Sequence, residues 1–145
     1  MTGNERLLIL AVALQVFLTL FILLWMGRER VPRVLRGEIK MDDIAVERTG
    51  YPLKARLLSN NFDNQFQLPV LFYVAALLAL WVGGVGIVEV VLAFLFVVLR
   101  YVHAAIHVTT NNVLQRFQAY SAGMLVLSAL WIWLVIRIVT APGAV

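Results

Sequence analysis

Four long apolar segments divide the chain, and each is long enough to cross a lipid bilayer. Residues 7–26 contain no charge, and about 20 apolar residues suffice for a transmembrane helix. Further spans are predicted at 66–82, within a helix that starts near residue 52, and at 87–108 and 117–139. The pattern predicts an all-α integral membrane protein, a four-transmembrane-helix bundle that forms a single domain over residues 1–145.

The first apolar segment could instead be a secretory signal. Such a signal has a shorter apolar region, preceded by net positive charge and followed by a small-residue cleavage site. Here Glu5 and Arg6 cancel before the segment, and GRERVPRVLR follows it. These flanks favour a permanent span.

Composition supports a membrane protein and limits its chemistry. The chain is 62% hydrophobic and 14% charged, whereas soluble domains are about 45–50% apolar and about 25% charged. It has no cysteine, which excludes disulfides, thiolate metal sites and a cysteine nucleophile. Any thiol chemistry must therefore use a thiol that a substrate brings.

The basic residues indicate the orientation of the spans. The net charge is +4, but the basic residues lie beside the spans, which favours contact with anionic membrane lipids over nucleic acid. The connection 27–56 holds eight of the twelve Lys and Arg residues, and the GGVG turn at 83–86 holds none. The positive-inside rule then places the first and third connections in the cytoplasm and both termini on the non-cytoplasmic side, for example of a bacterial inner membrane.

Polar residues gather where the second span begins, in the stretch KARLLSNNFDNQFQ at 54–67. On a helix, Arg56, Asn60, Asp63 or Asn64, and Gln67 share one face. This face could bind a zwitterionic ligand, with the guanidinium holding a carboxylate and the carboxylate an ammonium. Two alternatives stay open: the amides join neighbouring helices, or the segment lies solvated among the lipid headgroups.

The third span ends in LRYVHAAIHVTT, which brings more polar groups to the same boundary. His103 and His107 have the i, i+4 spacing that can bind a metal. No carboxylate or cysteine lies near them in the sequence to complete a site. We therefore predict no metal site, and expect these histidines to cap a helix or to donate hydrogen bonds.

These features resemble the MAPEG family, the membrane-associated proteins in eicosanoid and glutathione metabolism, and specifically a divergent bacterial-type member. The resemblance rests on Arg56, Asn60 and Asp63 on the second helix, on the Arg100–Tyr101 pair, and on Arg116 before the fourth span. It covers residues 5–138. It implies a homotrimer in which the second helix lines the three-fold axis.

The resemblance also implies a chemistry related to microsomal glutathione transferases. Glutathione would be a co-substrate bound between adjacent subunits by Arg56, Asn60, Asp63, Arg100 and Tyr101. Arg116 would be catalytic, because a guanidinium beside a thiol favours the thiolate. The implied activity is a glutathione transferase or peroxidase that acts on a lipophilic small molecule from the bilayer.

Two positions depart from the pattern of the glutathione-using members. The acid is Asp63, where Glu is usual, and Ala105 stands where several members carry a second Tyr. Two alternatives therefore stay open beside the enzyme. One is a non-catalytic scaffold or an accessory subunit of a larger membrane complex, and the other is a lipid or quinone binder.

Overall fold

The computed structural model of the chain describes residues 1–140, and every regular element in that part is a helix. Four helical segments are long and apolar enough to cross a membrane: Gly3–Leu35, Leu53–Val82, Ile87–Val108 and Val113–Thr140. The prediction of an all-α membrane protein with four transmembrane helices is confirmed.

The first helix, α1 (Gly3–Leu35), extends well beyond the predicted span at 7–26. It starts at a capping box, in which Thr2 and Glu5 satisfy each other's backbone amides. It continues through the basic segment because Arg and Glu favour helix and Arg33 pairs with Glu29 one turn earlier, at 3.5 Å. The connection predicted at 27–56 is therefore shorter and runs from 36 to 52, with a single 3₁₀ turn, η1 (Asp42–Ile44).

The second span is two helices, α2 (Leu53–Asn64) and α3 (Leu68–Val82), where the sequence predicts one helix that starts near residue 52 and continues through the span 66–82. Pro69 is the second residue of α3, where its missing amide proton costs nothing. The break lies just before it, at 65–67, where the amides of Gln65 and Phe66 turn back to the carbonyls of Phe62 and Asp63.

The last two helices, α4 (Ile87–Val108) and α5 (Val113–Thr140), are antiparallel neighbours. α5 starts four residues before the predicted 117. At the opposite end of α4, Gly83 and Gly84 take positive φ values of 74° and 66° in the turn from α3. Glu89, only 1% exposed, accepts a hydrogen bond from the Gly86 amide and pairs with Arg137 of α5 at 2.7 Å.

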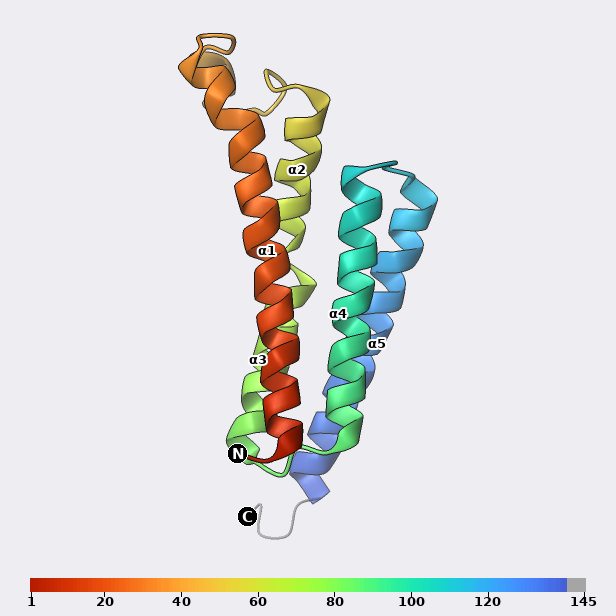
Figure 1. The fold of residues 1–145 in the computed structure, drawn as a ribbon. Coiled ribbons are helices and arrows are strands. Elements are labelled where there is room, and N and C mark those ends of the chain that lie inside the picture. The colour runs from red at the N-terminus through yellow and green to blue at the C-terminus, as the bar shows by residue number, and fades with distance from the viewer. Residues whose placement is uncertain (141–145) are drawn as a thin grey trace.

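The helices pack as a bundle (Figure 1), and the buried side chains of its two halves differ in chemistry. The N-terminus, the α3–α4 turn and the end of α5 lie together at one end, and the connections 36–52 and 109–112 lie at the other. The half near the N-terminus has an apolar core around Phe72 and Phe96, whose rings lie 4.9 Å apart. The other half, called here the loop half, has a smaller apolar cluster and holds most of the buried polar groups.

Candidate functional site

The polar stretch 54–67 has two faces, because neighbouring residues on a helix point about 100° apart. Asn61 and Gln65, four residues apart, are buried inside the bundle. Gln65 donates to Asn61 at 2.8 Å and accepts from Gln15 of α1 at 3.0 Å. Asn61 donates to the carbonyl oxygen of Ala104 at 3.1 Å. This chain of amides joins α1, α2 and α4, so the inner face joins helices within one chain.

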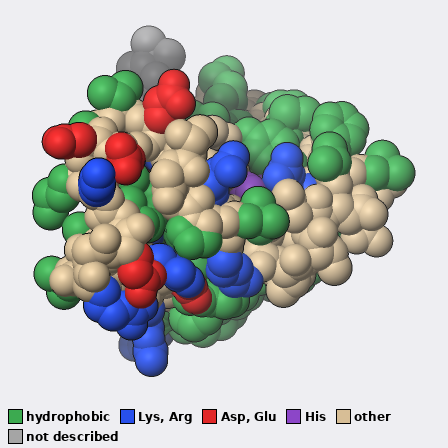
Figure 2. Space-filling model, turned by 90° about the horizontal axis from the view of Figure 1, so that it is seen from above, with side chains coloured by type: hydrophobic (Ala, Val, Ile, Leu, Met, Phe, Trp, Pro, Cys, Tyr) green, Lys and Arg blue, Asp and Glu red, His purple; other side chains and the backbone are tan. Residues whose placement is uncertain are grey.

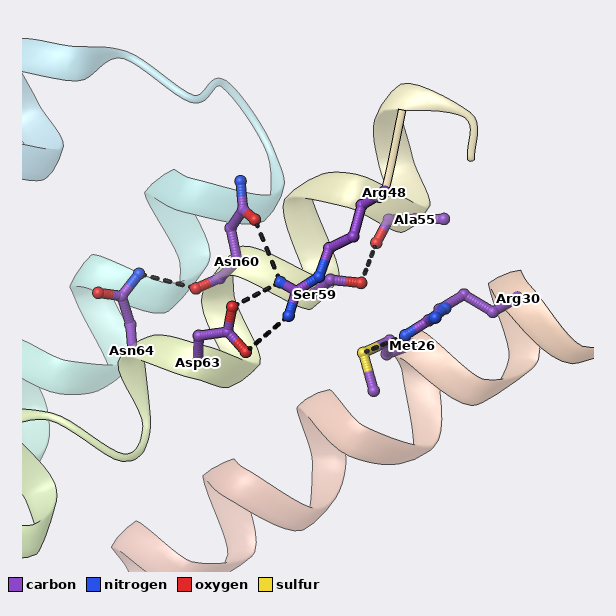
Figure 3. Close-up of polar contacts among 8 residues, drawn as sticks. All are labelled: Met26, Arg30, Arg48, Ala55, Ser59, Asn60, Asp63 and Asn64. Atoms are coloured by element: carbon purple, nitrogen blue, oxygen red, sulfur yellow. Dashed lines mark hydrogen bonds and ion pairs between the residues drawn. The ribbon is translucent and has the colours of Figure 1, made fainter. Parts of the chain in front are cut away.

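The outer face of α2 carries Arg56, Asn60 and Asp63, all of which are exposed in the single chain. Figure 3 shows Arg48, from the connection 36–52, reaching down to this face. Its guanidinium contacts the two carboxylate oxygens of Asp63 at 2.5 and 3.3 Å and Asn60 Oδ1 at 3.5 Å. The hydrogen bond to Asp63 raises the pKa of Arg48. Asp63 is therefore already paired within the chain.

A cavity of about 410 Å³ lies beside this face, between α2 and the α4–α5 pair at the loop end of the bundle. Seen onto that end, blue Lys and Arg side chains gather around a hollow in which a purple histidine is visible (Figure 2). The lining combines amides, imidazoles, one guanidinium, one phenol and two apolar side chains: Asn60, Asn64, His103, His107, Val113, Arg116, Phe117 and Tyr120.

Arg116, in the first turn of α5, brings the positive charge to this cavity. Its Nη1 donates to Asn111 Oδ1 at 2.7 Å. Asn111 itself has a positive φ of 49° in the short connection between α4 and α5. No carboxylate is among the lining residues, so the cavity suits an anionic or thiolate group.

The two histidines of the cavity are buried without hydrogen-bond partners for most of their ring nitrogens. His103 and His107 are 3% and 2% exposed. Within residues 1–140, His103 Nδ1 and both nitrogens of His107 make no hydrogen bond. The His103 ring lies 5.7 Å from the rings of both His107 and Tyr120. Buried polar groups usually have partners, so these nitrogens call for an explanation.

The side chains of Arg100 and Tyr101 contact two different helices. Arg100 is 1% exposed, and its Nη2 donates to the carbonyl oxygen of Asn64 at 2.9 Å. It thus pairs with a backbone carbonyl at the C-terminal end of α2, where the helix dipole favours a cation. Tyr101 is partly exposed, and its hydroxyl donates to the carbonyl oxygen of Leu14 on α1 at 2.8 Å.

The four spans and the polar loop half match a known family of membrane proteins. The family model of the MAPEG family matches residues 8–136. The chain belongs to the MAPEG family. The match includes all the predicted site residues and most of each span. No curated protein and no solved structure matches the chain.

In this MAPEG protein, the predicted site residues do not meet at one point. Asn60 and Arg116 line the cavity. Arg56 and Asp63 lie on the adjoining outer face of α2, and Arg100 contacts α2 from inside the bundle. Tyr101 contacts α1 instead, so within a single chain it does not share the site.

Other residues in and beside the candidate site escape reasoning from the sequence. Tyr120 lies one turn after Arg116, and its hydroxyl donates to Gln67 Oε1 at 3.4 Å. That i, i+4 spacing is the one signal in the sequence that could have indicated Tyr120. Arg48 lies in an irregular connection, where no periodicity predicts its contact with Asp63. In residues 1–140, no three His, Asp or Glu side chains cluster as metal ligands would.

Proposed function

We propose that this MAPEG protein is a thiol-dependent membrane enzyme that binds glutathione in the cavity at the loop end. It transfers the thiol to lipophilic compounds, or uses it to reduce them. The observation that carries the proposal is Arg116 in a polar cavity whose lining holds no carboxylate. A guanidinium in such a place stabilises a thiolate and lowers the pKa of the thiol that gives rise to it.

The size and the lining of the cavity support a small polar ligand. Ligand pockets have volumes of about 300–1,000 Å³, and this one has about 410 Å³. Asn60, Asn64 and Tyr120 offer amide and phenol groups for the peptide part of glutathione. Phe117 and Val113 give one side of the cavity an apolar wall, where a lipophilic electrophile from the bilayer can approach.

The outer face of α2 supports a homotrimer with α2 and α3 at the three-fold axis. Leu58 and Phe62 of α2 pack with Leu18 and Ile22 in the middle of α1, so α2 lies at the depth of the membrane. A polar face exposed to lipid at that depth is costly. A second and third copy of the chain would cover it and would bring further groups to the cavity.

The orientation of the protein follows from its charges. The end of the bundle with connections 36–52 and 109–112 carries most of the Lys and Arg residues, so it faces the cytoplasm. Both termini then lie on the non-cytoplasmic side. The cavity opens toward the cytoplasm, where glutathione is available to it.

A second candidate function is a non-catalytic MAPEG scaffold, in which the outer face of α2 serves assembly alone. The ion pair between Arg48 and Asp63 favours it, because the acid expected to hold the ligand's ammonium already has a partner. In this case the cavity would have no turnover to support.

A turnover assay distinguishes the two functions. Purified protein is incubated with glutathione and 1-chloro-2,4-dinitrobenzene, and in parallel with cumene hydroperoxide, as lipophilic probes. We expect saturable turnover in the wild-type protein, and a rate lower by about 100-fold or more in Arg116→Ala. Arg28→Ala removes an exposed positive charge at the same end, away from the cavity, and serves as the control. Equal activity of the Arg116→Ala and wild-type proteins would overturn the role of Arg116, and no turnover with either probe would favour the scaffold.

A further inference from the structure

His107 is the cavity residue whose surroundings least explain it. Neither of its ring nitrogens has a hydrogen-bond partner within residues 1–140, although the side chain is 2% exposed. An apolar residue of similar size would pack at this position at a lower cost in free energy, because a buried polar group without a hydrogen-bond partner is unfavourable. The unpaired imidazole therefore indicates a partner that arrives with the ligand.

The position of His107 identifies what that partner can be. His107 is in the last turn of α4 and Arg116 is in the first turn of α5, and the four residues 109–112 join the two helices. Both side chains line the same cavity. A thiol that Arg116 draws into the cavity is thus beside an imidazole that has a free lone pair.

We propose that His107 accepts the proton of the bound thiol, so that the thiolate forms between the imidazole of His107 and the guanidinium of Arg116. The inference rests on the proposed function and assigns the proton acceptor of that site. Imidazole is the side chain that most often performs this task in enzymes near neutral pH.

In the transfer reaction, glutathione is the nucleophile and the lipophilic electrophile carries the leaving group. The S–H bond of glutathione breaks, its electron pair stays on sulfur, and the proton moves to a ring nitrogen of His107. The thiolate attacks the electrophilic carbon, forms the C–S bond and displaces the leaving group with its electron pair. The imidazolium then gives its proton to the leaving group where that group is basic, or to water where a weak base such as chloride leaves, which returns His107 to the neutral form. No oxidant or reductant is needed.

The second histidine is less suited to this role. His103 lies one turn deeper on α4, and its ring is 5.7 Å from that of Tyr120, one turn after Arg116 on α5. Beneath it lies Arg100, whose guanidinium is held by the end of α2. His103 therefore belongs to the deeper level of the cavity, and His107 to the level of Arg116.

The test follows the thiolate and the proton separately. Glutathione is mixed rapidly with the purified protein in weak buffer. Ultraviolet absorbance reports the thiolate, and an indicator dye reports the proton released to the medium. The variants are His107→Gln, which keeps a polar side chain of similar size, and Thr109→Ala. Thr109→Ala is the control at the same helix end, because it removes only a bond to the carbonyl oxygen of Ala105.

We expect the wild-type protein and Thr109→Ala to form thiolate with little proton released to the medium. In His107→Gln, thiolate formation should slow by about 100-fold or more, and each thiolate that forms should release one proton. Glutathione binding by calorimetry should persist in His107→Gln, which shows that the variant is folded. Equal rates and equal proton release in both proteins would overturn the inference alone. Absence of glutathione binding to the wild-type protein would overturn the proposed function and the inference with it.

Discussion

Gln15 and Gln65 meet in the interior of the bundle, where the Gln15 Nε2 lies 3.0 Å from the Gln65 Oε1. Fifty residues separate them in the chain, and both are fully or almost fully buried. Gln65 follows the last residue of α2, so the contact secures the point at which the second span is broken. The break in the second span and the chain of buried amides thus share the residue Gln65.

Loss of either partner should destabilise the protein. Gln65→Leu leaves Gln15 Nε2 and Asn61 Oδ1 without their hydrogen-bond partner, and we expect a loss of about 1–2 kcal/mol in the free energy of unfolding in detergent. The double variant Gln15→Leu/Gln65→Leu should cost less than the sum of the single variants, with a coupling of about 0.5–1.5 kcal/mol. Gln118→Leu, on an exposed position of α5, is the control. Strict additivity of the two changes would contradict the contact.

Hydropathy predicts much of this fold because the bilayer requires long apolar helices. It cannot locate the break in the second span, because Pro69 permits both a kink and a new helix start. The contacts of Gln65 with α1 and α2 decide between them. It also cannot find the end of α1, since the residues after 26 leave the apolar pattern and still favour helix.

The site is less predictable than the fold, because it depends on how the helices are rotated about their axes. The sequence places Asn60 and Asn61 side by side, but only packing decides that Asn61 enters the bundle and Asn60 the cavity. Arg100 and Tyr101 diverge for the same reason. The spacing of Arg56, Asn60 and Asp63 correctly predicts a shared face, and the structure adds Arg48 to it.

The ion pair between Arg48 and Asp63 should affect ligand binding more than stability. Both side chains are about half exposed, so Arg48→Ala should cost less than about 1 kcal/mol of stability, and added salt should reduce this cost. Because Arg48 has a raised pKa, its contribution is fully present below its ordinary pKa and is lost only as pH rises through the raised value. The cost of Arg48→Ala should therefore not depend on the titration of Arg48 between about pH 6 and about pH 9.

Removal of Arg48 should also free Asp63 for the ammonium of glutathione. We expect Arg48→Ala to bind glutathione more tightly, by up to about tenfold. Arg36→Ala, in the same connection and paired with Glu38, is the control. Weaker binding by Arg48→Ala would mean that Arg48 itself contacts the ligand.

Glu89 and Arg137 should stabilise the end of the bundle opposite the site. Glu89→Ala leaves Arg137 without its carboxylate and the Gly86 amide without its acceptor. We expect Glu89→Ala to lower the free energy of unfolding by about 3–5 kcal/mol. Glu89→Gln keeps an acceptor for the Gly86 amide and should destabilise the protein less. Thermal unfolding in detergent measures the stability of both variants, and an equal loss of stability in the two would contradict a role for the amide acceptor.

The proposed trimer predicts which surfaces of neighbouring chains meet. The chain lacks cysteine, so single cysteines can be introduced without background. Val74→Cys, on the exposed face of α3, should form disulfide-linked dimers on mild oxidation in membranes, whereas Leu125→Cys, exposed on α5, should not. Light scattering of the purified protein should give the mass of three chains. Cross-linking from Leu125→Cys alone, or a monomeric mass, would contradict α2 and α3 at a shared axis.

The proposed function is tested most directly by calorimetric titration of glutathione into the detergent-purified protein, beside Arg116→Ala and Arg28→Ala. We expect saturable binding to the wild-type and Arg28→Ala proteins. We expect Arg116→Ala to weaken binding by roughly 10- to 100-fold, which corresponds to the loss of a charge-assisted hydrogen bond. No binding to the wild-type protein up to about 10 mM, weaker than roughly −3 kcal/mol, would contradict the proposed function.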